Sequence, residues 1–327
     1  MFFNRRSLMA GGLAAEAGLA LLAVPAKAQN YPTRNITMIV PFAAGGPTDV
    51  IARIVTGHMA QTLGQSIIIE NVVGAGGTTA TTRASRAAND GYTLITGHMG
   101  THAASVPLYP NLAYHPEKSF EPVALLAGTP ILILARKDFA PKDLKEFVAY
   151  VKANETKVNA AHAGIGSVSN VSCELLNSVL GVKPVGVPFN GTGPAMNALV
   201  AGQVDYMCDQ IVNAVPQING GTIKAYAVAT PERNPSLPNV PTTAEAGLPA
   251  FQAQAWNAIF APKGTPPEVV AKLNDAVVKA LNDENVRKRL LDLGSVIPAP
   301  ADRSQAALGT LVKNEIAKWT PVLKPVN

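Results

Sequence analysis

Two adjacent glycines, Gly45 and Gly46, stand in a loop at residues 41–49 that could bind an anion through backbone N–H groups. The loop follows a short β-branched, apolar run at 35–40 and precedes a periodic apolar segment, which is the pattern of a strand, a turn and a helix. Glycine allows a positive φ and a close approach of the backbone to a ligand, and a helix that begins near Pro47 aims unpaired N–H groups at the same point. The pattern predicts an anion pocket made of backbone, with a tight turn that binds nothing as the alternative.

A second copy of this arrangement follows directly. Residues 66–71 form another buried-strand run, and the loop after it carries a cluster of small residues before a helical segment: Gly74, Ala75, Gly76 and Gly77. If the two strands are parallel neighbours, right-handed crossovers place both loops at the carboxyl edge of one sheet, where open α/β sheets bind ligands. The repeat therefore favours a shared ligand site over two independent packing turns.

Titratable side chains near these loops suit structural roles better than catalysis. Asp49 falls in the first turn of the expected helix, where it can complement the helix dipole or hold a loop N–H group. A third polar loop at 97–102 holds His98 and His102 next to Thr101. Either histidine could contact a ligand, but no acidic residue lies close in sequence, so a hydrogen-bonded structural histidine is the preferred interpretation.

The remaining periodicity predicts two α/β lobes. After a strand at 92–96, apolar runs at 123–126 and 131–134 are split by Gly128, Thr129 and Pro130, and a new series of strands and helices begins. The later predicted strands span 158–162, 185–189, 204–208, 223–229 and 256–261, and the later predicted helices include 142–152, one through Leu180, 195–201, 269–281, 287–293 and 305–322. Chain crossings near 128–136 and 250–257 would place 29–129 plus 255–327 in lobe 1 and 130–254 in lobe 2, with the last helices returning to lobe 1.

The first 28 residues have the features of an export signal. Arg5 and Arg6 precede an apolar stretch that is followed by the A-x-A pattern at residues 26–28, and the paired arginines suggest the twin-arginine route. A membrane anchor is the alternative, but the apolar stretch is shorter than the ~20 residues needed to span a bilayer. We expect cleavage near Ala28 and a soluble, periplasmic mature protein.

Composition narrows the classes of partner. The signal carries three of the 27 basic residues and one of the 22 acidic residues, so the mature chain is only mildly basic. No cluster of arginine or lysine with aromatic residues indicates a nucleic-acid partner. Cys173 and Cys208 show no metal-binding spacing, and they could be two buried thiols or one disulfide. We expect no metal.

These motifs together resemble the Bug family, the periplasmic substrate-binding proteins of tripartite tricarboxylate transporters. The motifs occur in the order and spacing of the family and span nearly the whole mature chain. They lie at residues 41–49 with Ala52 and Arg53, and at 70–77, 90–94, 101–102, 187–189, 202–205 and 261–266.

The resemblance implies an α/β fold of the periplasmic-binding-protein-like type II class, a two-lobed Venus flytrap with hinge crossings. It implies that the loop at 42–49 holds one carboxylate of a small organic acid through backbone amides and waters, that 74–77 lines the cleft, and that 164–170 and Asp209 contact the variable end of the ligand. The expected ligand is a dicarboxylate or an aromatic carboxylate. Asn170 and Asn190 stand where many members carry a cation, which puts a second strongly charged group on the ligand in doubt and, with Asp209, favours a neutral or hydrogen-bond-donating distal group. The expected partners are the membrane components of a tripartite transporter, and no cofactor is expected. The expected ligand-binding residues are Phe42, Ala43, Ala44, Gly45, Gly46, Asp49, Gly74, Ala75, Gly76, Gly77, Thr101, His102, Gly166, Ser167, Asn170, Asn190 and Asp209.

An exported α/β enzyme is the less favoured reading. Glu70 stands where a dinucleotide fold places its ribose-binding acid, but a G-x-G-x-x-G motif from Gly45 would require glycine where Pro47 and Val50 stand. There is no G-x-S-x-G motif, and Ser167 has no adjacent base in sequence. A sensing or scavenging carboxylate binder without a transporter of its own is a third reading that the residues do not separate from the receptor.

Overall fold

The structure is a computed structural model that describes residues 31–323 and 325, and the expected export signal lies outside them. The chain from Pro32 onward forms one compact unit. No helix within the described residues is long and apolar enough to cross a membrane.

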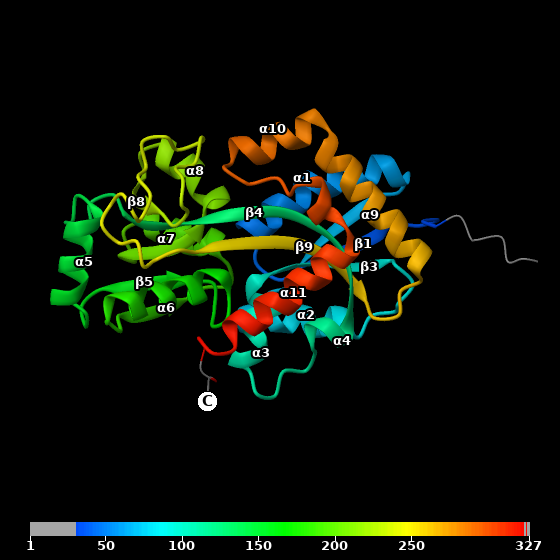
Figure 1. Ribbon diagram of the computed structural model, residues 1–327, viewed down its shortest axis with the longest axis horizontal. Coiled ribbons are helices and arrows are strands. Elements are labelled where there is room, and N and C mark those ends of the chain that lie inside the picture. The colour runs from blue at the N-terminus through cyan, green and yellow to red at the C-terminus, as the bar shows by residue number, and fades with distance from the viewer. Residues whose placement is uncertain (1–30, 324, 326–327) are drawn as a thin grey trace, which may run out of the picture. The chain divides into compact units, whose positions relative to one another are not determined.

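One mixed sheet organises the described chain (Figure 1). Its strands are β1 (Ile36–Val40), β2 (Ile67–Asn71), β3 (Thr93–His98), β4 (Phe120–Arg136), β5 (Asn159–His162), β6 (Val185–Pro188), β7 (Tyr206–Gln210), β8 (Ile223–Val228) and β9 (Gln254–Pro262). Their order in space is β2-β1-β3-β9-β4-β7-β5-β6, and β8 pairs with β4. Because β1 is parallel to both β2 and β3, the glycine loops after β1 and β2 share one sheet edge, as the sequence predicts.

The long strands β4 and β9 join the two halves of this sheet. The first part of β4 pairs antiparallel with β9 as far as Pro130, and from Ile131 onward β4 pairs with β7. The two apolar runs at 123–126 and 131–134, which the sequence splits at Gly128, Thr129 and Pro130, therefore belong to one continuous strand. Pro130 is tolerated within β4 because it lies where the strand changes its pairing partner from β9 to β7. Its missing N–H therefore interrupts no continuous ladder of hydrogen bonds. In Figure 1 both strands run from the side of α9 and α11 to the side of α5 and α6.

Helices cover the sheet on both sides. They are α1 (Pro47–Leu63), α2 (Thr78–Ser85), α3 (Ser105–Leu108), α4 (Pro116–Ser119), α5 (Leu144–Ala153), α6 (Val168–Leu180), α7 (Thr192–Val200), α8 (Ile211–Asn219), α9 (Pro267–Asn282), α10 (Glu284–Asp292) and α11 (Gln305–Trp319). The helices α9 and α10 pack against α1, and α11 packs against β4 and the turn at Gly100–Ala104. The C-terminal helices thus return to the first half of the sheet, as expected.

The helix α8 was not expected from the sequence. Between β7 and β8 the chain forms α8, whose apolar residues Ile211, Val212 and Val215 are buried. Pro216 lies inside this helix, and proline normally disfavours a helix interior because it lacks an N–H donor. Tertiary packing of the apolar face overrides that local preference.

The hydrophobic core is continuous across the two halves of the sheet. One buried cluster contains Ile39 and Phe260 from the first half together with Ile133, Phe147 and Tyr206 from the second. The division into lobes at residues 129/130 and 254/255 therefore stays a prediction.

The two cysteines are buried, free thiols. The backbone N–H of Cys208 donates to the Sγ atom of Cys173 at 3.1 Å, and burial raises the pKa of the Cys208 thiol well above its ordinary value. The sequence left open either two buried thiols or one disulfide, and in the structure Cys173 and Cys208 are two buried thiols.

Candidate ligand-binding site

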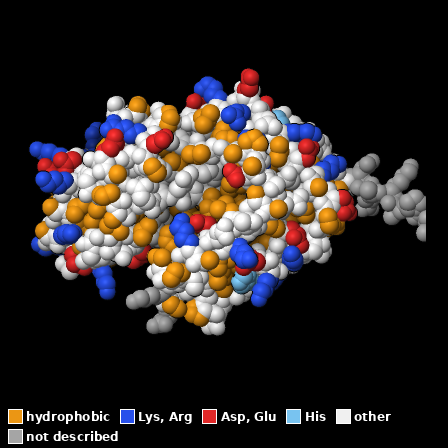
Figure 2. Space-filling view, viewed as in Figure 1, with side chains coloured by type: hydrophobic (Ala, Val, Ile, Leu, Met, Phe, Trp, Pro, Cys, Tyr) orange, Lys and Arg blue, Asp and Glu red, His pale blue; other side chains and the backbone are white. Residues whose placement is uncertain are grey.

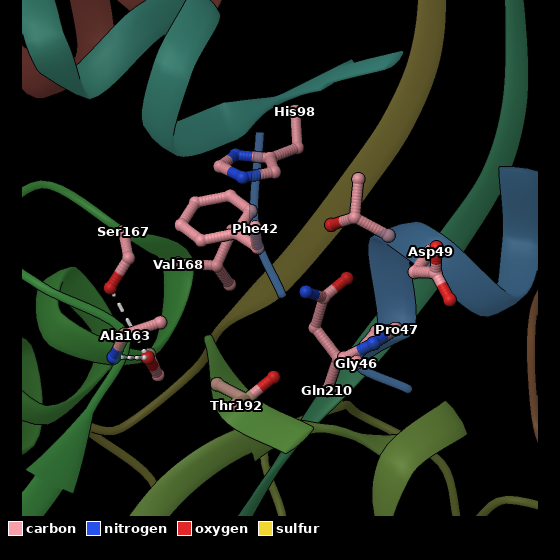
Figure 3. A pocket seen from close by; sticks show the side chains of 12 residues that line it. Phe42, Gly46, Pro47, Asp49, His98, Ala163, Ser167, Val168, Thr192 and Gln210 are labelled. Carbon is pink, nitrogen blue, oxygen red and sulfur yellow. Dashed lines mark hydrogen bonds between the residues drawn. The ribbon is translucent and has the colours of Figure 1, made fainter. Parts of the chain in front are cut away.

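Three helices begin around one small cavity (Figure 3). Residues at the starts of α1, α6 and α7 line it, together with side chains from the ends of β3 and β7. The lining residues are Phe42, Gly46, Pro47, Thr48, Asp49, His98, Ala163, Ser167, Val168, Ser169, Thr192 and Gln210. The cavity volume is about 20 Å³, which is room for about one water molecule.

The start of α1 supplies backbone donors to this cavity. Gly46 precedes the helix without a side-chain cap, and Pro47 occupies the first helical position. The amides of Thr48 and Asp49 in the first turn therefore have no capping side chain, and the helix dipole adds partial positive charge there. Both residues are buried in the cavity wall.

The two glycines of this loop have different roles. Gly45 takes the positive φ of 86°, and Gly46 is extended with a φ of −82°. Only Gly45 thus makes the turn that the sequence predicts. Gly46 instead lies in close approach to the start of α7, because a Cβ there would lie a tight 3.3 Å from the Oγ1 atom of Thr192.

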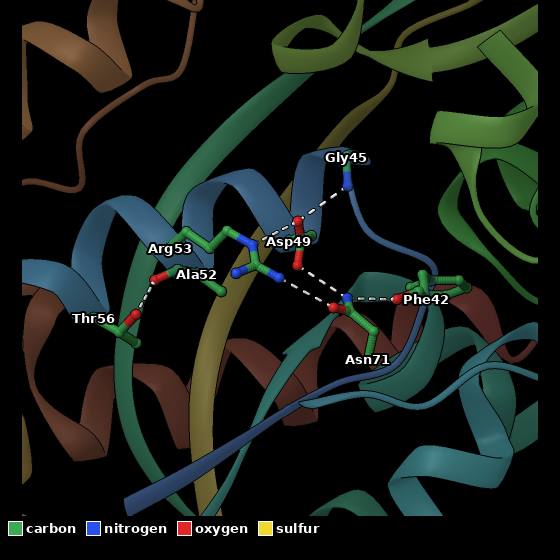
Figure 4. A network of polar contacts seen from close by, with 7 residues as sticks. All are labelled: Phe42, Gly45, Asp49, Ala52, Arg53, Thr56 and Asn71. Atoms are coloured by element: carbon green, nitrogen blue, oxygen red, sulfur yellow. Dashed lines mark hydrogen bonds and ion pairs between the residues drawn. The ribbon is translucent and has the colours of Figure 1, made fainter. Parts of the chain in front are cut away.

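The carboxylate of Asp49 holds the loop in place (Figure 4). Its Oδ2 atom accepts from the Gly45 N–H at 3.0 Å and from Arg53 Nε at 2.9 Å, and its Oδ1 atom accepts from Asn71 Nδ2 at 2.9 Å. Asn71 Nδ2 also donates to the carbonyl oxygen of Phe42 at 2.9 Å. Burial raises the pKa of the Asp49 carboxyl, but the hydrogen bonds from Arg53, Gly45 and Asn71 outweigh it, so the pKa is lowered and Asp49 is ionised.

Hydroxyl groups shape the opposite wall. Ser167 caps α6, since its Oγ atom accepts from the N–H of Asn170 at 3.2 Å, and Ser169 Oγ accepts from the N–H of Ala163 at 2.9 Å. The start of α7 at Thr192 has no side-chain cap. The second half of the sheet therefore presents two further helix N-termini to the cavity.

Two side chains from strand ends complete the wall. His98, the last residue of β3, stacks on Phe42 with ring centroids 5.1 Å apart. Burial lowers its pKa to about 3, and its Nδ1 atom accepts from the N–H of Gly100 at 2.9 Å, so a neutral imidazole carries its proton on Nε2. Gln210, the last residue of β7, accepts at Oε1 from Thr129 and Asn257.

No lysine or arginine is among the residues that line the cavity in the described chain. Its one charged lining residue, Asp49, is paired with Arg53. The electrostatic field inside the cavity therefore comes from helix N-termini and neutral donors, which favours an anion of small size.

Direct contacts join the two halves of the sheet beside the cavity. The N–H of Ala43 donates to the carbonyl oxygen of Asn190 at 3.0 Å, and the hydroxyl of Tyr109 donates to the carbonyl oxygen of Ile165 at 2.8 Å. Gly76 lies so near Ile165 that a Cβ on the glycine would be 1.7 Å from the same oxygen. The cavity volume of about 20 Å³ means that a ligand much larger than a water molecule fits only if the two halves move apart.

The predicted site residues fall into three positions. Phe42, Gly46, Asp49 and Ser167 lie on the cavity wall. Others border the cavity: Gly74, Ala75, Gly76 and Asn190 line a neighbouring groove, while Ala43, Ala44 and Gly45 continue the loop and Gly166 donates to Asn170 Oδ1 at 2.9 Å. The rest stand behind the wall, namely Gly77, Thr101, His102, Asn170 and Asp209.

His102 is a core residue in this structure. Its ring stacks on Phe260 with centroids 4.0 Å apart, and its Nδ1 atom is 2.9 Å from the hydroxyl of Thr101. Burial lowers its pKa well below the ordinary value, so the ring is neutral. This burial and the hydrogen bond to Thr101 agree with the interpretation of His102 as a structural histidine. Its role as a ligand contact stays a prediction.

The cavity wall also contains His98, which the sequence left open as a ligand contact, and Thr192 and Gln210, to which the sequence gave no site role. The available signal is position at a strand end, because His98 and Gln210 are the last residues of β3 and β7 at the ligand-binding edge, but the predicted strands at 92–96 and 204–208 end two residues before them. Thr192 is the first residue of α7, in a glycine-containing loop of the same kind as the first one.

Asp209 supports the wall from behind as a buried carboxyl group. Its Oδ2 atom accepts from Asn213 Nδ2 at 2.6 Å, its Oδ1 atom accepts from the N–H of Gln210 at 2.8 Å, and the side chain is fully buried. Burial raises its pKa to about 7, and hydrogen bonds from Asn213, Gln210 and Thr192 only partly offset this effect.

We predict that Asp209 makes the free energy of unfolding depend on pH. Because its folded-state pKa of about 7 lies above the ordinary value of 3.8, the folded protein keeps a proton that the unfolded chain releases. Stability should therefore fall as the pH rises between these values, with the loss complete above about pH 7. Urea unfolding of the parent and of Asp209→Asn between about pH 5 and 8 measures the free energy of unfolding of each protein. The free energy of unfolding of the variant, relative to that of the parent, should rise with pH. Parallel curves for the two proteins would contradict the assignment.

Comparison with known proteins agrees with this geometry. Residues 51–327 match the family described as the tripartite tricarboxylate transporter family receptor. The structure of MatC from Rhodopseudomonas palustris with bound malate superimposes with a TM-score of 0.87 at 59% identity, covering 89% of this chain and 99% of that one. The periplasmic binding protein BugD gives a TM-score of 0.87 at 41% identity, covering 90% of this chain and all of that one.

A third protein of known structure extends the comparison to another ligand. R. palustris Rpa4515 with adipate gives a TM-score of 0.85 at 31% identity, covering 90% of this chain and 100% of that one. These neighbours confirm the predicted two-lobed, periplasmic-binding-protein-like fold and the resemblance to the Bug proteins. The chain belongs to the tripartite tricarboxylate transporter receptor family of solute-binding proteins.

Proposed function

We propose that the mature protein is a periplasmic receptor for a small dicarboxylate of the malate class. The observation that carries this proposal is the convergence of α1, α6 and α7 on one cavity that no lysine or arginine lines in the described chain. Helix N-termini on opposite walls can each receive one carboxylate. The malate found in the protein that shares 59% identity with this chain supports that ligand class.

Neutral donors are sufficient for this task. A hydrogen bond to a charged group contributes about 1.5–3 kcal/mol, so several donors around one carboxylate offset the loss of its hydration. The amides of Thr48 and Asp49 and the Nε2 proton of His98 serve one end of the ligand. The starts of α6 and α7 and the amide of Gln210 serve the other end.

Binding requires the two halves of the sheet to separate and close again. The cavity volume of about 20 Å³ is far smaller than the few hundred Å³ typical of small-molecule pockets. The contacts of Gly76 and Tyr109 with Ile165 must open to admit a ligand. Closure by rotation about the crossing strands β4 and β9 is the motion that fits this topology.

The same residues support binding without turnover. His98 Nδ1 accepts a backbone N–H, and its pKa of about 3 makes the ring a poor base near neutral pH. Ser167 Oγ accepts from Asn170 and lies 3.2 Å from Ser169 Oγ, so no base activates it among the described residues. A receptor role needs only the donors already named.

Family membership and the N-terminal residues support the cellular part of the proposal. An export signal cleaved near Ala28 would release the protein into the periplasm, where membrane components of a tripartite transporter would receive the loaded form. On the face shown in Figure 2, lysine and arginine are interspersed with aspartate and glutamate, without the single basic patch that a nucleic-acid partner requires.

Calorimetry on the mature protein starting at Gln29 tests the ligand class. We expect saturable binding of malate, and binding of lactate or benzoate weaker by about tenfold or more because each lacks a second carboxylate and its charge-assisted hydrogen bonds. Adipate and citrate test the tolerance for length and for a third charge. Malate recovered unchanged supports a receptor, whereas its consumption or the absence of saturable binding would sink the proposal.

Gly76→Ala tests whether the observed closure is needed for binding. A Cβ at Gly76 would meet the carbonyl oxygen of Ile165 at 1.7 Å, so the variant cannot close and should lose malate affinity by about tenfold or more. Gly181→Ala is the matched control, since Gly181 has a similar φ of 70° against 61° for Gly76 and its Cβ would meet no atom within 4 Å. Small-angle scattering should show compaction by malate in the control only. Equal affinity in the two variants would show that this closure is not part of binding.

A further inference from the structure

Three buried polar side chains meet where β4, β7 and β9 lie side by side. The Oγ1 atom of Thr129 donates to Oε1 of Gln210 at 2.7 Å, and Nδ2 of Asn257 donates to the same oxygen at 2.9 Å. Their exposed fractions are 0% for Thr129 and Asn257 and 3% for Gln210. Of the three, only Gln210 lines the ligand cavity.

This cluster is poorly explained as a source of stability. The Oδ1 atom of Asn257 is buried without a hydrogen-bond partner among the described residues. An unsatisfied buried acceptor is costly, and a partly satisfied polar cluster is less stable than apolar side chains of the same shape. The amide of Asn257 therefore needs a reason other than stability.

The two hydrogen bonds orient the Gln210 amide. Both end on Oε1, so the Nε2 group with its two donors, on the other arm of the planar amide, points away from Thr129 and Asn257. Figure 3 shows the nitrogen of Gln210 turned toward the middle of the cavity. Without Thr129 and Asn257, rotation of the amide would present an oxygen to an anionic ligand, which is repulsive.

The strand register links this amide to the other half of the site. Asn257 lies opposite His98 in the antiparallel pair of β3 and β9, and Ile131 lies opposite Gln210 where β4 begins to pair with β7. One rigid frame of strands thus sets both His98 and Gln210. Their spacing across the cavity is fixed by backbone pairing rather than by flexible loops.

We propose that Thr129 and Asn257 are positioning residues that hold the Gln210 amide with its nitrogen toward the distal carboxylate of the bound dicarboxylate. This inference rests on the proposed function, because it assigns a donor and its two supports to one end of that ligand. Neither positioning residue touches the ligand, and both act only through Gln210.

A double-mutant cycle with malate as the probe tests the coupling. Thr129→Val keeps the shape of the side chain and removes its hydroxyl, and we expect it to raise the Kd for malate roughly fivefold, as for one lost hydrogen bond. In a Gln210→Met background, the same substitution should change the Kd no further. Equal effects in the two backgrounds would overturn the proposal, because they would indicate a general structural defect.

Two further variants separate positioning from stability. Asn257→Leu removes an unsatisfied buried acceptor, so it should weaken malate binding while leaving the urea midpoint unchanged or higher. Thr265→Val removes a buried hydroxyl that bonds Pro262 away from the cavity, and it should leave the Kd unchanged. A loss of affinity in Thr265→Val equal to that in Thr129→Val would count against the proposal.

A ligand-free measurement keeps the inference separate from the proposed function. In protein with ¹⁵N-labelled glutamine, the side-chain NH₂ signal of Gln210 is identified by its loss in Gln210→Met. Thr129→Val and Asn257→Leu should shift or broaden that signal, and no change in either would overturn the proposal. If the parent does not bind malate, the proposed function fails, and this measurement still decides the positioning.

Discussion

The buried carboxylate of Asp49 is the interaction on which the site depends. It binds the N–H of Gly45 in its own loop, Arg53 one turn along α1, and Asn71 at the end of the neighbouring strand β2. Loop, helix and sheet are thereby fixed relative to one another. The start of α1 keeps its direction toward the cavity because three separate elements share this one acceptor group.

A site made of helix N-termini imposes its own constraints on the surrounding chain. Backbone donors reach a small anion only where side chains are absent, which explains why Gly46 and Gly76 lie in close contact with the other half of the sheet. Neutral donors also discriminate less strongly between ligands of different charge than an arginine side chain would. Selectivity must therefore come from the length of the ligand and the position of its polar groups. The buried cluster of Thr129, Gln210 and Asn257 supplies one such fixed position.

The glycine loops could be predicted from the sequence because their signal is local. Each loop follows an apolar strand and precedes a helix, and the parallel pairing of β1 with β2 confirms their common edge. Which of the two histidines at 97–102 reaches the site could not be predicted in the same way. His98 and His102 occur in one loop, but the turn at Gly100–Ala104 sends one ring to the cavity and the other into the core beside Phe260.

The limits of local patterns are also clear elsewhere. Gln210 is a single polar residue at the end of a buried strand, and its environment is set by β4 and β9, which are distant in sequence. The continuity of β4 through Pro130 depends on a change of pairing partner that no local pattern encodes. Positions decided by tertiary neighbours were missed, whereas those decided by glycine, strand and helix order were found.

A crystal structure of the protein with malate would test the central claim most directly. We predict carboxylate oxygens within about 3 Å of the amides of Thr48 or Asp49 and of Nε2 of His98 at one end, and of Nε2 of Gln210 at the other. Malate bound outside this cavity, or held there by a lysine or arginine side chain, would contradict the account.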